Sequence, residues 1–447
     1  MTAPSSSRPR LTVVGTGYLG ATHAVCMAEL GFEVLGLDVD EAKVEALRSG
    51  KVPFFEPELD ELLVKQLESG RLRFTTSFEE VGAFGDVHFV CVGTPQKKGE
   101  YAADLVYVDA AFGALLPHAR AGSLLVGKST VPAGTAERLA ELVARERGEE
   151  LELAWNPEFL REGFAVEDTL QPDRLVFGVR SEQAEAQLRA AFAPVIDPVD
   201  REPTPVVVTD FATAQLVKVA ANAFLATKIS FINAMAEVCE VTGGDVTLLS
   251  KALSYDTRIG GRFLNAGLGF GGGCLPKDIR AFMARAGELG VDQALSFLRE
   301  VDAINLRRRA RMVDLAREEL DGSFGGMRVA VLGAAFKPNS DDIRDSPALD
   351  VAASMQRQGA AVTVYDPAAM DNARIKHPEL GYRDSTADAA KGADLVLLLT
   401  EWDEFKTMDP TELGGIVNER RILDGRNALD PDTWRAAGWT YRALGRP

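Results

Sequence analysis

A short apolar run, a glycine-rich turn and a second apolar run that ends on an acid open this chain. Residues 11–14 read LTVV, residues 15–20 read GTGYLG, residues 21–30 resemble a helix, and residues 33–38 end on Asp38. This order, with the acid 18 residues after the last glycine, is typical of a dinucleotide-binding βαβ unit. The pattern predicts a parallel α/β sheet whose first helix receives a pyrophosphate at its N-terminus.

The acid at the end of the second predicted strand indicates which dinucleotide is preferred. Asp38 would accept hydrogen bonds from the adenosine ribose hydroxyls and repel a 2′-phosphate, and no arginine follows it immediately. We therefore expect NAD rather than NADP. Lys43, one turn into the next helix, is either a further cofactor contact or a solvated helix lysine. The cofactor-binding residues expected in this unit are Gly15, Gly17, Tyr18, Leu19, Gly20, Asp38 and Lys43.

Two further strand-like runs are followed by threonines. Residues 87–92 lead into Thr94, and residues 123–127 lead into Thr130. Ligands of open parallel sheets bind at the carboxyl ends of the strands, so both threonines are candidate lining residues. The alternative for each is a helix N-cap. Cys91, at the end of the first of these runs, is expected in the core.

The segment of residues 269–278, GFGGGCLPKD, sets one thiol among four glycines, with a lysine and a carboxylate three and four positions later. A lysine or a helix N-terminus beside a thiol favours the nucleophilic thiolate. Asp278 would lie one turn beyond Cys274 if a helix starts there. The competing interpretation is a glycine turn with a buried cysteine. The glycine density and the charged flank favour Cys274 as a nucleophile.

Apolar residues between about residues 211 and 241 are spaced by three and four, as an amphipathic helix requires. Such a helix would be roughly 45 Å long at 1.5 Å per residue. It is too long for one small domain and suits a domain bridge or a dimer interface. Helical pattern returns over residues 294–320, where Arg307, Arg308 and Arg309 are expected on a solvated face.

A second set of strand-like runs covers residues 328–333, 361–366 and 393–400, without a GxGxxG motif. It predicts either a second nucleotide-type site built differently or a structural repeat. The predicted fold is α/β, with two Rossmann-like doubly wound domains joined by a long central helix or helical domain. The expected parts are a disordered tail (1–10), an NAD-binding domain (11–205), a central helical and dimerisation domain with the cysteine loop (206–315) and a C-terminal domain (316–447).

Composition excludes several classes of function. A net charge of −17 over 447 residues argues against a nucleic-acid surface. The four cysteines and four histidines have no ligand-like spacing, so neither a disulfide framework nor a metal site is expected. No unbroken apolar run approaches 18 residues and the first ten residues lack a signal-peptide core, so no membrane span is expected. Reduced thiols are typical of a cytoplasmic protein.

Motifs along nearly the whole chain resemble those of the UDP-glucose/GDP-mannose dehydrogenase family. They read, in order, GTGYLG, CVGTPQ, STVPAGT, NPEFLREG, KVAANAFLATKISFIN, RIGGRFLNAGLGFGGGCLPKD, VLGAAFKPNSDDIRDSP and ILDGRN. The resemblance implies an enzyme that oxidises the primary alcohol of a nucleotide sugar to a carboxylate, using two NAD+, with a UDP-sugar-binding C-terminal domain. The RIG segment favours UDP-glucose, with UDP-glucuronate as product, over GDP-mannose or UDP-N-acetylmannosamine.

The resemblance also implies roles for individual residues. Cys274 would capture the aldehyde as a thiohemiacetal, which is oxidised to a thioester and hydrolysed by water. Lys218 and Asn222, four residues apart on the long helix, would bind oxyanions along this path. Asp278 is the expected partner of the water used in proton transfer and hydrolysis.

A second carboxylate is expected from the NPEFLRE segment. The resemblance indicates Glu162, assisted by Thr130. Glu158 and Glu162 are four residues apart, so if the segment is helical they share a face, and like-charge proximity would raise the pKa of one. The alternative for either glutamate is a surface helix acid.

Ligand contacts follow from the same resemblance. The substrate-binding residues that it marks are Glu158, Phe159, Leu160, Lys218, Asn222, Arg258, Phe263, Gly271, Phe336, Lys337 and Arg426. The further cofactor contacts that it marks are Thr94, Thr130, Glu162, Lys277 and Arg344. Arg258 often comes from the other subunit in this family, which implies a homodimer through the central helices. Ala234 stands where family members often carry glutamate, and this departure leaves the catalytic set intact.

Two more distant functions remain as alternatives. A 3-hydroxyacid dehydrogenase shares a Rossmann domain and a Lys-x-x-x-Asn helix, but its single hydride transfer needs no thiol. A non-catalytic NAD-binding or scaffold protein would be expected to lose Cys274, Lys218 or Asp278, and the chain carries all three.

Overall fold

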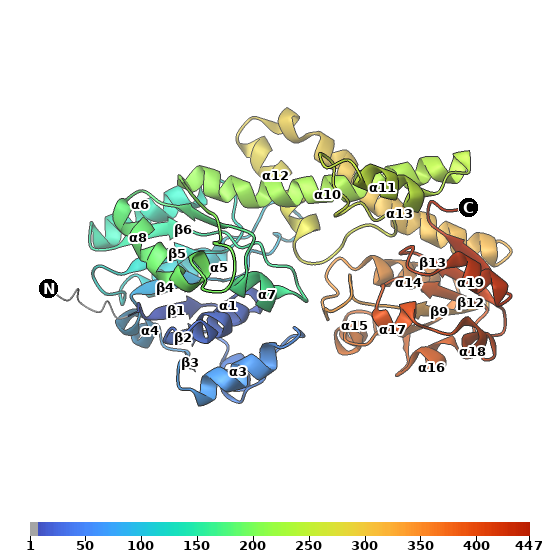
Figure 1. Cartoon of the computed structure of the whole chain (residues 1–447), viewed down its shortest axis with the longest axis horizontal. Helices are drawn as coiled ribbons and strands as arrows, with labels where there is room; N and C mark the ends of the chain where they lie inside the picture. The colour runs from blue at the N-terminus through green and yellow to red at the C-terminus, as the bar shows by residue number, and fades with distance from the viewer. Residues whose placement is uncertain (1–7) are drawn as a thin grey trace. The chain divides into compact units, whose positions relative to one another are not determined.

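The computed structural model describes residues 8–447, which form two compact units, the first ending at Ala221 and the second running from Asn222 to Pro447 (Figure 1). The division falls inside one long helix, α10 (Phe211–Thr242). Each unit has its own sheet. The predicted α/β class with two Rossmann-like domains and a long central helix is confirmed.

The first unit is built on an eight-stranded sheet in the order β3-β2-β1-β4-β5-β6-β7-β8. Its strands pair in parallel except β6 with β7. The strands are β1 (Leu11–Val14), β2 (Val34–Leu37), β3 (Leu72–Thr75), β4 (Val87–Val90), β5 (Leu124–Gly127), β6 (Glu152–Trp155), β7 (Leu175–Gly178) and β8 (Val206–Thr209). The order reverses between β1 and β4, and ligands of doubly wound sheets bind at such a point.

Helices cover both faces of this sheet. They are α1 (Tyr18–Glu29), α2 (Glu41–Arg48), α3 (Leu59–Glu68), α4 (Phe78–Phe84), α5 (Val106–Leu115), α6 (Thr135–Arg147), α7 (Ala165–Leu170), α8 (Glu182–Ala191) and α9 (Ala193–Ile196). Successive strand residues point to opposite faces, so Leu124 and Val126 join the core beside α1, α3 and α8, whereas Leu125 joins the core beside α5 and α6. Strands buried on both faces account for the unbroken apolar runs in the sequence.

The second unit contains a six-stranded parallel sheet in the order β11-β10-β9-β12-β13-β14. Its strands are β9 (Arg328–Leu332), β10 (Ala361–Tyr365), β11 (Gly381–Tyr382), β12 (Leu395–Leu398), β13 (Arg421–Asp424) and β14 (Thr440–Ala443). Its helices after α10 are α11 (Val246–Ser254), α12 (Leu275–Glu288), the 3₁₀ helix η1 (Asp292–Leu295), α13 (Phe297–Glu319), α14 (Pro347–Arg357), α15 (Met370–Lys376), α16 (Thr386–Ala390), α17 (Asp403–Lys406), α18 (Pro410–Gly414) and α19 (Pro431–Ala436).

Helix α10 matches the helix predicted over residues 211–241. By length and mean hydropathy it is the one helix within residues 8–447 that could span a membrane, although core helices of water-soluble proteins meet the same test. Polar residues interrupt the apolar residues of this helix, so it contains no unbroken apolar run of 18 residues. Most of the predicted tail lies outside the described residues. Of its remainder, Arg8 donates to Leu30 O (2.5 Å) and Arg10 N to Asp86 Oδ2 (2.8 Å).

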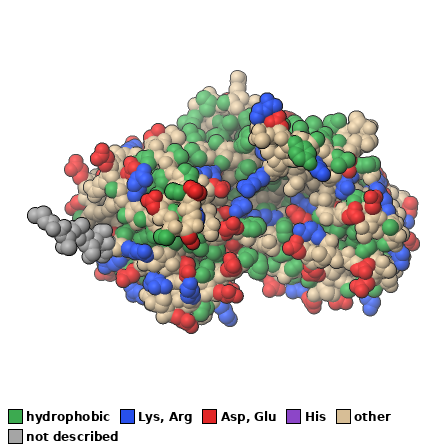
Figure 2. Space-filling view, viewed as in Figure 1, with side chains coloured by type: hydrophobic (Ala, Val, Ile, Leu, Met, Phe, Trp, Pro, Cys, Tyr) green, Lys and Arg blue, Asp and Glu red, His purple; other side chains and the backbone are tan. Residues whose placement is uncertain are grey.

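The expectation of a solvated arginine face on α13 is wrong for two of the three residues. Arg308 is fully buried and pairs with Glu240 at 2.7 Å, and Arg309 is 6% exposed and pairs with Asp345 at 2.9 Å. Carboxylates from distant parts of the second unit meet this face, and a buried cation requires such partners. Charges of both signs are also interspersed over the visible face of each unit in Figure 2.

Candidate active site

The turn after β1 has the geometry that a bound pyrophosphate requires. Gly15 has φ of +89°, and a Cβ atom at Gly20 would lie 1.8 Å from the carbonyl oxygen of Gly15, so neither position accepts a side chain. Helix α1 begins at Tyr18 after Gly17, without a side-chain cap and without an acid in its first turn. Its first N–H groups and the positive end of its dipole are therefore available to an anion.

Asp38 follows β2 and lies beside this turn. Its Oδ2 atom accepts a hydrogen bond from Thr16 N at 2.9 Å and pairs with Lys43 Nζ at 2.9 Å. Burial raises the pKa of the Asp38 carboxyl, but Lys43 and the backbone N–H groups lower it further, so the pKa lies below its ordinary value. Asp38 is thus held as a carboxylate at the expected ribose position, and the residues present fit NAD. Through its ion pair with Asp38, Lys43 also lies in the predicted cofactor-binding region.

The two threonines predicted to line the site lie together. Thr94 Oγ1 donates to the backbone oxygen of Thr130 at 2.8 Å, which joins the loops after β4 and β5. Neither residue caps a helix, since α5 begins at Val106 and α6 begins at Thr135 after Gly134. Cys91 is buried in the core as predicted, where burial raises the pKa of its thiol to about 12.

Lys218, on the part of α10 in the first unit, forms an ion pair with Glu158. Their Nζ and Oε1 atoms are 3.0 Å apart, and the side chains are 5% and 13% exposed. Burial raises the pKa of the Glu158 carboxyl, but Lys218 and the hydrogen bond from Leu160 N outweigh burial and hold the pKa below its ordinary value. The ring of Phe159 lies 5.6 Å from Lys218 Nζ.

The condition under which Glu158 and Glu162 would share a helix face is not met. Residues 156–161 are neither helical nor extended, and Gly163 has φ of +79°. Glu158 faces a lysine rather than another carboxylate, and its pKa falls rather than rises. Pro157 explains part of the difference, because proline removes a backbone donor and disfavours helical geometry at the residue before it.

Lys128, which follows β5 in the same unit, belongs to no motif that predicted a role for it. It is 6% exposed, donates to Asn156 Oδ1 at 2.9 Å and lies over the rings of Phe89 and Phe192 at 5.9 and 5.5 Å. Burial lowers the pKa of this lysine below its ordinary value. A cation directly after an unbroken apolar strand was the sequence signal that could have identified it.

In the second unit, Cys274 is the N-cap residue of α12 and is exposed, whereas the other three cysteines are buried. Asp278 lies one turn further, with its N–H donating to Cys274 O at 2.9 Å. The Asp278 carboxylate is 2% exposed and accepts from Asn222 Nδ2 at 2.6 Å and from Lys277 Nζ at 2.6 Å. The structure therefore brings three predicted residues, Cys274, Asn222 and Lys277, together around the buried carboxylate of Asp278.

The glycines before Cys274 are packed too closely for side chains. A Cβ atom would lie 2.4 Å from Asp345 O at Gly271, 2.8 Å from the Phe336 ring at Gly272, and 2.2 Å from the guanidinium of Arg344 at Gly273. Two predicted ligand contacts in the loop after β9, Phe336 and Arg344, therefore lie against the cysteine loop.

Arg426 is also placed at this loop. It donates to the backbone oxygens of Gly269 at 3.0 Å and Phe336 at 3.1 Å. Burial lowers the pKa of its guanidinium. Arg426 therefore shapes the loop through backbone contacts, and Lys337, whose Nζ lies 5.5 Å from the Phe336 ring, supplies a second cation nearby.

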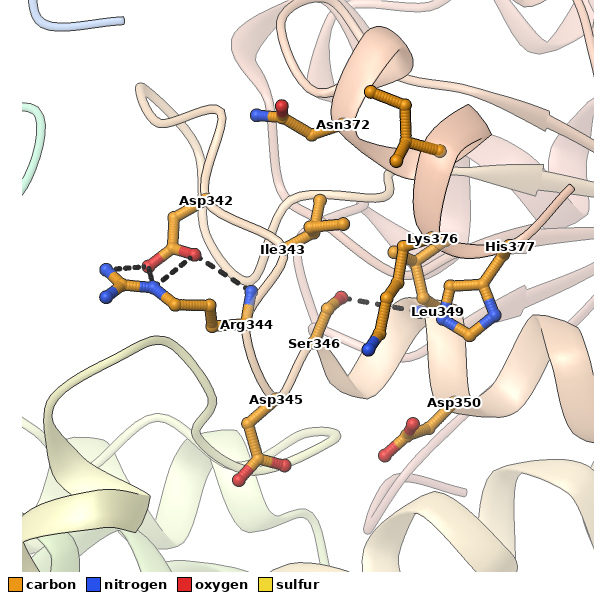
Figure 3. A pocket seen from close by; sticks show the side chains of 11 residues that line it. Asp342, Ile343, Arg344, Asp345, Ser346, Leu349, Asp350, Asn372, Lys376 and His377 are labelled. Carbon is orange, nitrogen blue, oxygen red and sulfur yellow. Dashed lines mark hydrogen bonds and ion pairs between the residues drawn. The ribbon is translucent and has the colours of Figure 1, made fainter. Parts of the chain in front are cut away.

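A cavity of about 570 Å³ lies beside the same loop, between residues 342–346, α14 and α15 (Figure 3). Asp342 accepts from Arg344 Nη2 at 2.7 Å and from Gly273 N at 3.3 Å. Figure 3 shows Arg344 pointing away from Lys376 and His377, which line the far side. This wall of the cavity therefore also supports the cysteine loop.

Arg258 and Phe263 lie on the surface. The Arg258 side chain is 87% exposed and pairs with Asp256 at 2.6 Å, and Phe263 has φ of +65°. Within residues 8–447, no group of three or more His, Cys, Asp or Glu side chains is arranged to hold a metal ion.

Comparisons with known proteins identify the family of the chain. Three models of the UDP-glucose/GDP-mannose dehydrogenase family match: the NAD binding domain at residues 9–196, the central domain at 212–307 and the UDP binding domain at 330–431. A UDP-glucose 6-dehydrogenase of Rickettsia conorii is 41% identical over 97% of this chain and 99% of its own, and one of Rhizobium meliloti is 38% identical over 98% and 100%.

Solved structures are similar along the same length. A UDP-glucose dehydrogenase from Pyrobaculum islandicum matches with a TM-score of 0.90 and 38% identity, covering all of both chains. A UDP-D-ManNAc dehydrogenase from Pyrococcus horikoshii matches with a TM-score of 0.84 and 27% identity, covering 98% of this chain and 99% of that one. The chain belongs to the UDP-glucose/GDP-mannose dehydrogenase family.

Proposed function

We propose that the protein oxidises UDP-glucose to UDP-glucuronate with two NAD+ and one water, through a covalent intermediate on Cys274. The observation that carries the mechanism is the exposed Cys274 thiol at the start of α12, one turn from a buried carboxylate that Asn222 and Lys277 hold in place. A nucleophile with an oriented acid or base beside it is the arrangement that covalent catalysis needs. NAD+ supplies the hydride acceptor for both oxidations.

In the first half of the reaction the C6 alcohol loses a hydride and a proton and becomes an aldehyde. Glu162, assisted by Thr130, is the carboxylate that we propose for the proton. The Cys274 sulfur then bonds to the aldehyde carbon, the carbonyl π bond opens, and the thiol proton passes to the oxygen, giving a thiohemiacetal. Lys218 and Asn222, one turn apart on α10, hold the oxygen that carries negative charge in these steps, with Glu158 fixing Lys218.

In the second half the thiohemiacetal loses a second hydride and a proton and becomes a thioester. Water attacks the thioester carbon and loses a proton, the carbon–sulfur bond breaks, the acid is released, and the Cys274 thiolate takes up a proton to regenerate the thiol. Asp278 is the base that we propose for this water, because Asn222 and Lys277 occupy one oxygen each and orient the carboxylate. Covalent capture keeps the reactive aldehyde bound until both oxidations are complete.

We further propose that the sugar nucleotide contacts the residues that the family resemblance marks. They are Glu158, Phe159, Leu160, Lys218, Asn222, Arg258, Phe263, Gly271, Phe336, Lys337 and Arg426. The cofactor contacts are Gly15, Gly17, Tyr18, Leu19, Gly20, Asp38, Lys43, Thr94, Thr130, Glu162, Lys277 and Arg344. We place the reaction in the cytoplasm.

The function is tested by the stoichiometry of oxidation. The purified protein, supplied with NAD+ and a panel of UDP- and GDP-sugars, should form two NADH per UDP-glucose consumed. Two per a different sugar would keep the mechanism and change the substrate, whereas one per sugar would contradict the role of Cys274.

In the same assay kcat/KM with NADP+ should be at least about a hundredfold lower, because Asp38 would repel a 2′-phosphate. Equal use of both cofactors would contradict that assignment.

We propose that the protein works as a homodimer through the central helices. On α10, Phe224 is 67% exposed, Phe231 49% and Val238 50%, and apolar side chains in such a row favour burial against another chain. The exposed Arg258 would then serve the partner's site.

Mixing Arg258→Ala and Cys274→Ala protomers should restore part of the activity that each variant lacks. A mixed dimer contains one site with both native residues, so up to about a quarter of wild-type activity is expected. Activity is measured after exchange has been verified with differently tagged protomers. Complete exchange without recovery would contradict a role for Arg258 across the interface.

A further inference from the structure

Glu56 is a buried carboxylate, 6% exposed, in the connection between α2 and α3. Its Oε1 atom accepts a hydrogen bond from Ala165 N at 2.7 Å, and its Oε2 atom accepts one from Gly163 N at 2.7 Å. Oε2 also accepts a hydrogen bond from the hydroxyl of Tyr18. A carboxylate taken out of water needs such donors, and here both oxygens are used.

These donors come from two segments that the proposed reaction uses separately. Tyr18 is the first residue of α1, inside the GxGxxG turn. Gly163 directly follows Glu162, and its φ of +79° makes the turn from which the Glu162 side chain leaves. Gly163 N also donates to the Tyr18 hydroxyl at 3.1 Å. The dinucleotide turn and the Glu162 turn therefore share one hydrogen-bonded junction.

The side chains at this junction influence one another electrostatically. Burial raises the pKa of the Tyr18 hydroxyl above its ordinary value, and the negative charges of Glu56 and Glu162 raise it further. The Glu162 carboxylate thus lies within electrostatic range of the tyrosine. Tyr18 is also held from its other side, with its ring 4.8 Å from that of Phe54, two residues before Glu56.

We propose that Glu56 is a positioning residue that couples cofactor binding to the placement of Glu162. The Glu56 carboxylate ties the Gly163 turn to the turn at Tyr18, so a dinucleotide bound at Tyr18 stabilises the placement of the Glu162 side chain through this junction. The inference rests on the proposed role of Glu162 in proton transfer.

A second ion pair on the same loop provides a comparison that distinguishes coupling to the cofactor from structural support of the loop alone. Arg161 pairs with Asp168 at 2.5 Å, and Arg161 N donates to the same carboxylate at 2.7 Å. This pair holds the other side of Glu162, and the Arg161 side chain is 50% exposed. Among residues 8–447, the hydrogen bonds and the ion pair of Arg161 and Asp168 involve neither Tyr18 nor Glu56, so loss of this pair should disturb the loop without disturbing cofactor binding.

The test compares Glu56→Gln, Tyr18→Phe and their double variant in the full-length protein. Gln keeps the shape of Glu56 but turns an amide donor toward a backbone donor. We expect the dissociation constant of NAD+, measured by calorimetry without sugar, to rise about tenfold in Glu56→Gln, and kcat to fall by a similar factor. The double variant should be no worse than Glu56→Gln alone, because both changes break one junction.

Asp168→Asn should lower kcat without changing NAD+ affinity, and Glu61→Gln, an exposed change on α3, should change neither.

Coupling to Glu162 gives the decisive comparison. Glu162→Gln should lower kcat strongly in the wild-type background and much less in the Glu56→Gln background. Independent, multiplicative effects would overturn the proposal, as would a folded Glu56→Gln protein with wild-type affinity and kcat. If Glu56→Gln does not fold, Tyr18→Phe, which keeps the carboxylate and the ring contact, is paired with Glu162→Gln instead. NAD+ affinity does not depend on Cys274, so a failure here is distinguishable from a failure of the covalent mechanism.

Discussion

Replacing Cys274 by serine should abolish release of UDP-glucuronate, with a loss of at least about a thousandfold in kcat. A serine hydroxyl is far less nucleophilic than a thiolate at neutral pH, so the aldehyde is not captured and no thioester forms. The NAD+ dissociation constant should remain within about twofold, because the dinucleotide turn and Asp38 lie in the other unit. Product is measured by chromatography, and NAD+ affinity by calorimetry without sugar.

Exposure of the thiols supplies the control. Cys274 is exposed and Cys26, Cys91 and Cys239 are buried, so a thiol reagent should label the wild-type protein about once and inactivate it. The Cys274→Ser protein should resist labelling, whereas Cys239→Ala should keep both labelling and activity. Acid release at the wild-type rate from Cys274→Ser would remove the covalent intermediate from the mechanism.

Most of the fold could be predicted from local sequence patterns. Unbroken apolar runs predicted the parallel strands, because both faces of each sheet are buried. Spacing by three and four predicted α10 within a residue of its end. The glycine density before Cys274 marked this loop in the sequence, and the structure shows that Gly271, Gly272 and Gly273 have no room for side chains. Each of these signals depends on residues near one another in the sequence.

The parts that sequence could not predict depend on distant partners. Arg308 was expected in solvent because nothing beside it in the sequence is acidic, whereas its partner Glu240 lies on α10. Glu158 would share a face with Glu162 only in a helix, but Pro157 and the turn at Gly163 leave it facing Lys218, 60 positions away. Glu56 carries no motif at all, and only the fold shows that its carboxylate meets Tyr18 and Gly163.

Lys218→Met should be the most damaging change in the first unit, for both stability and activity. The lysine is buried, and its removal leaves the Glu158 carboxylate in the same environment without its cation. Breaking a buried ion pair in this way costs about 3–5 kcal/mol of unfolding free energy. Loss of the fixed positive charge beside the developing oxyanion should lower kcat by about a hundred- to a thousandfold. Denaturant unfolding and steady-state kinetics measure the two effects.

The pH dependence of stability and a second substitution distinguish the loss of stability in Lys218→Met from the loss of kcat. In the wild type the pKa of Glu158 lies below its ordinary value, so its stabilising contribution is full above about pH 4.3 and is lost as the pH falls through the folded-state pKa. The wild type loses this contribution on acidification, whereas Lys218→Met lacks the ion pair at every pH, so the stability deficit of Lys218→Met should narrow as the pH falls. Adding Glu158→Gln removes the unpaired charge and should restore most of the stability at neutral pH, whereas kcat should stay low. Recovery of kcat together with stability would mean that Lys218 supports the fold and takes no part in the chemistry.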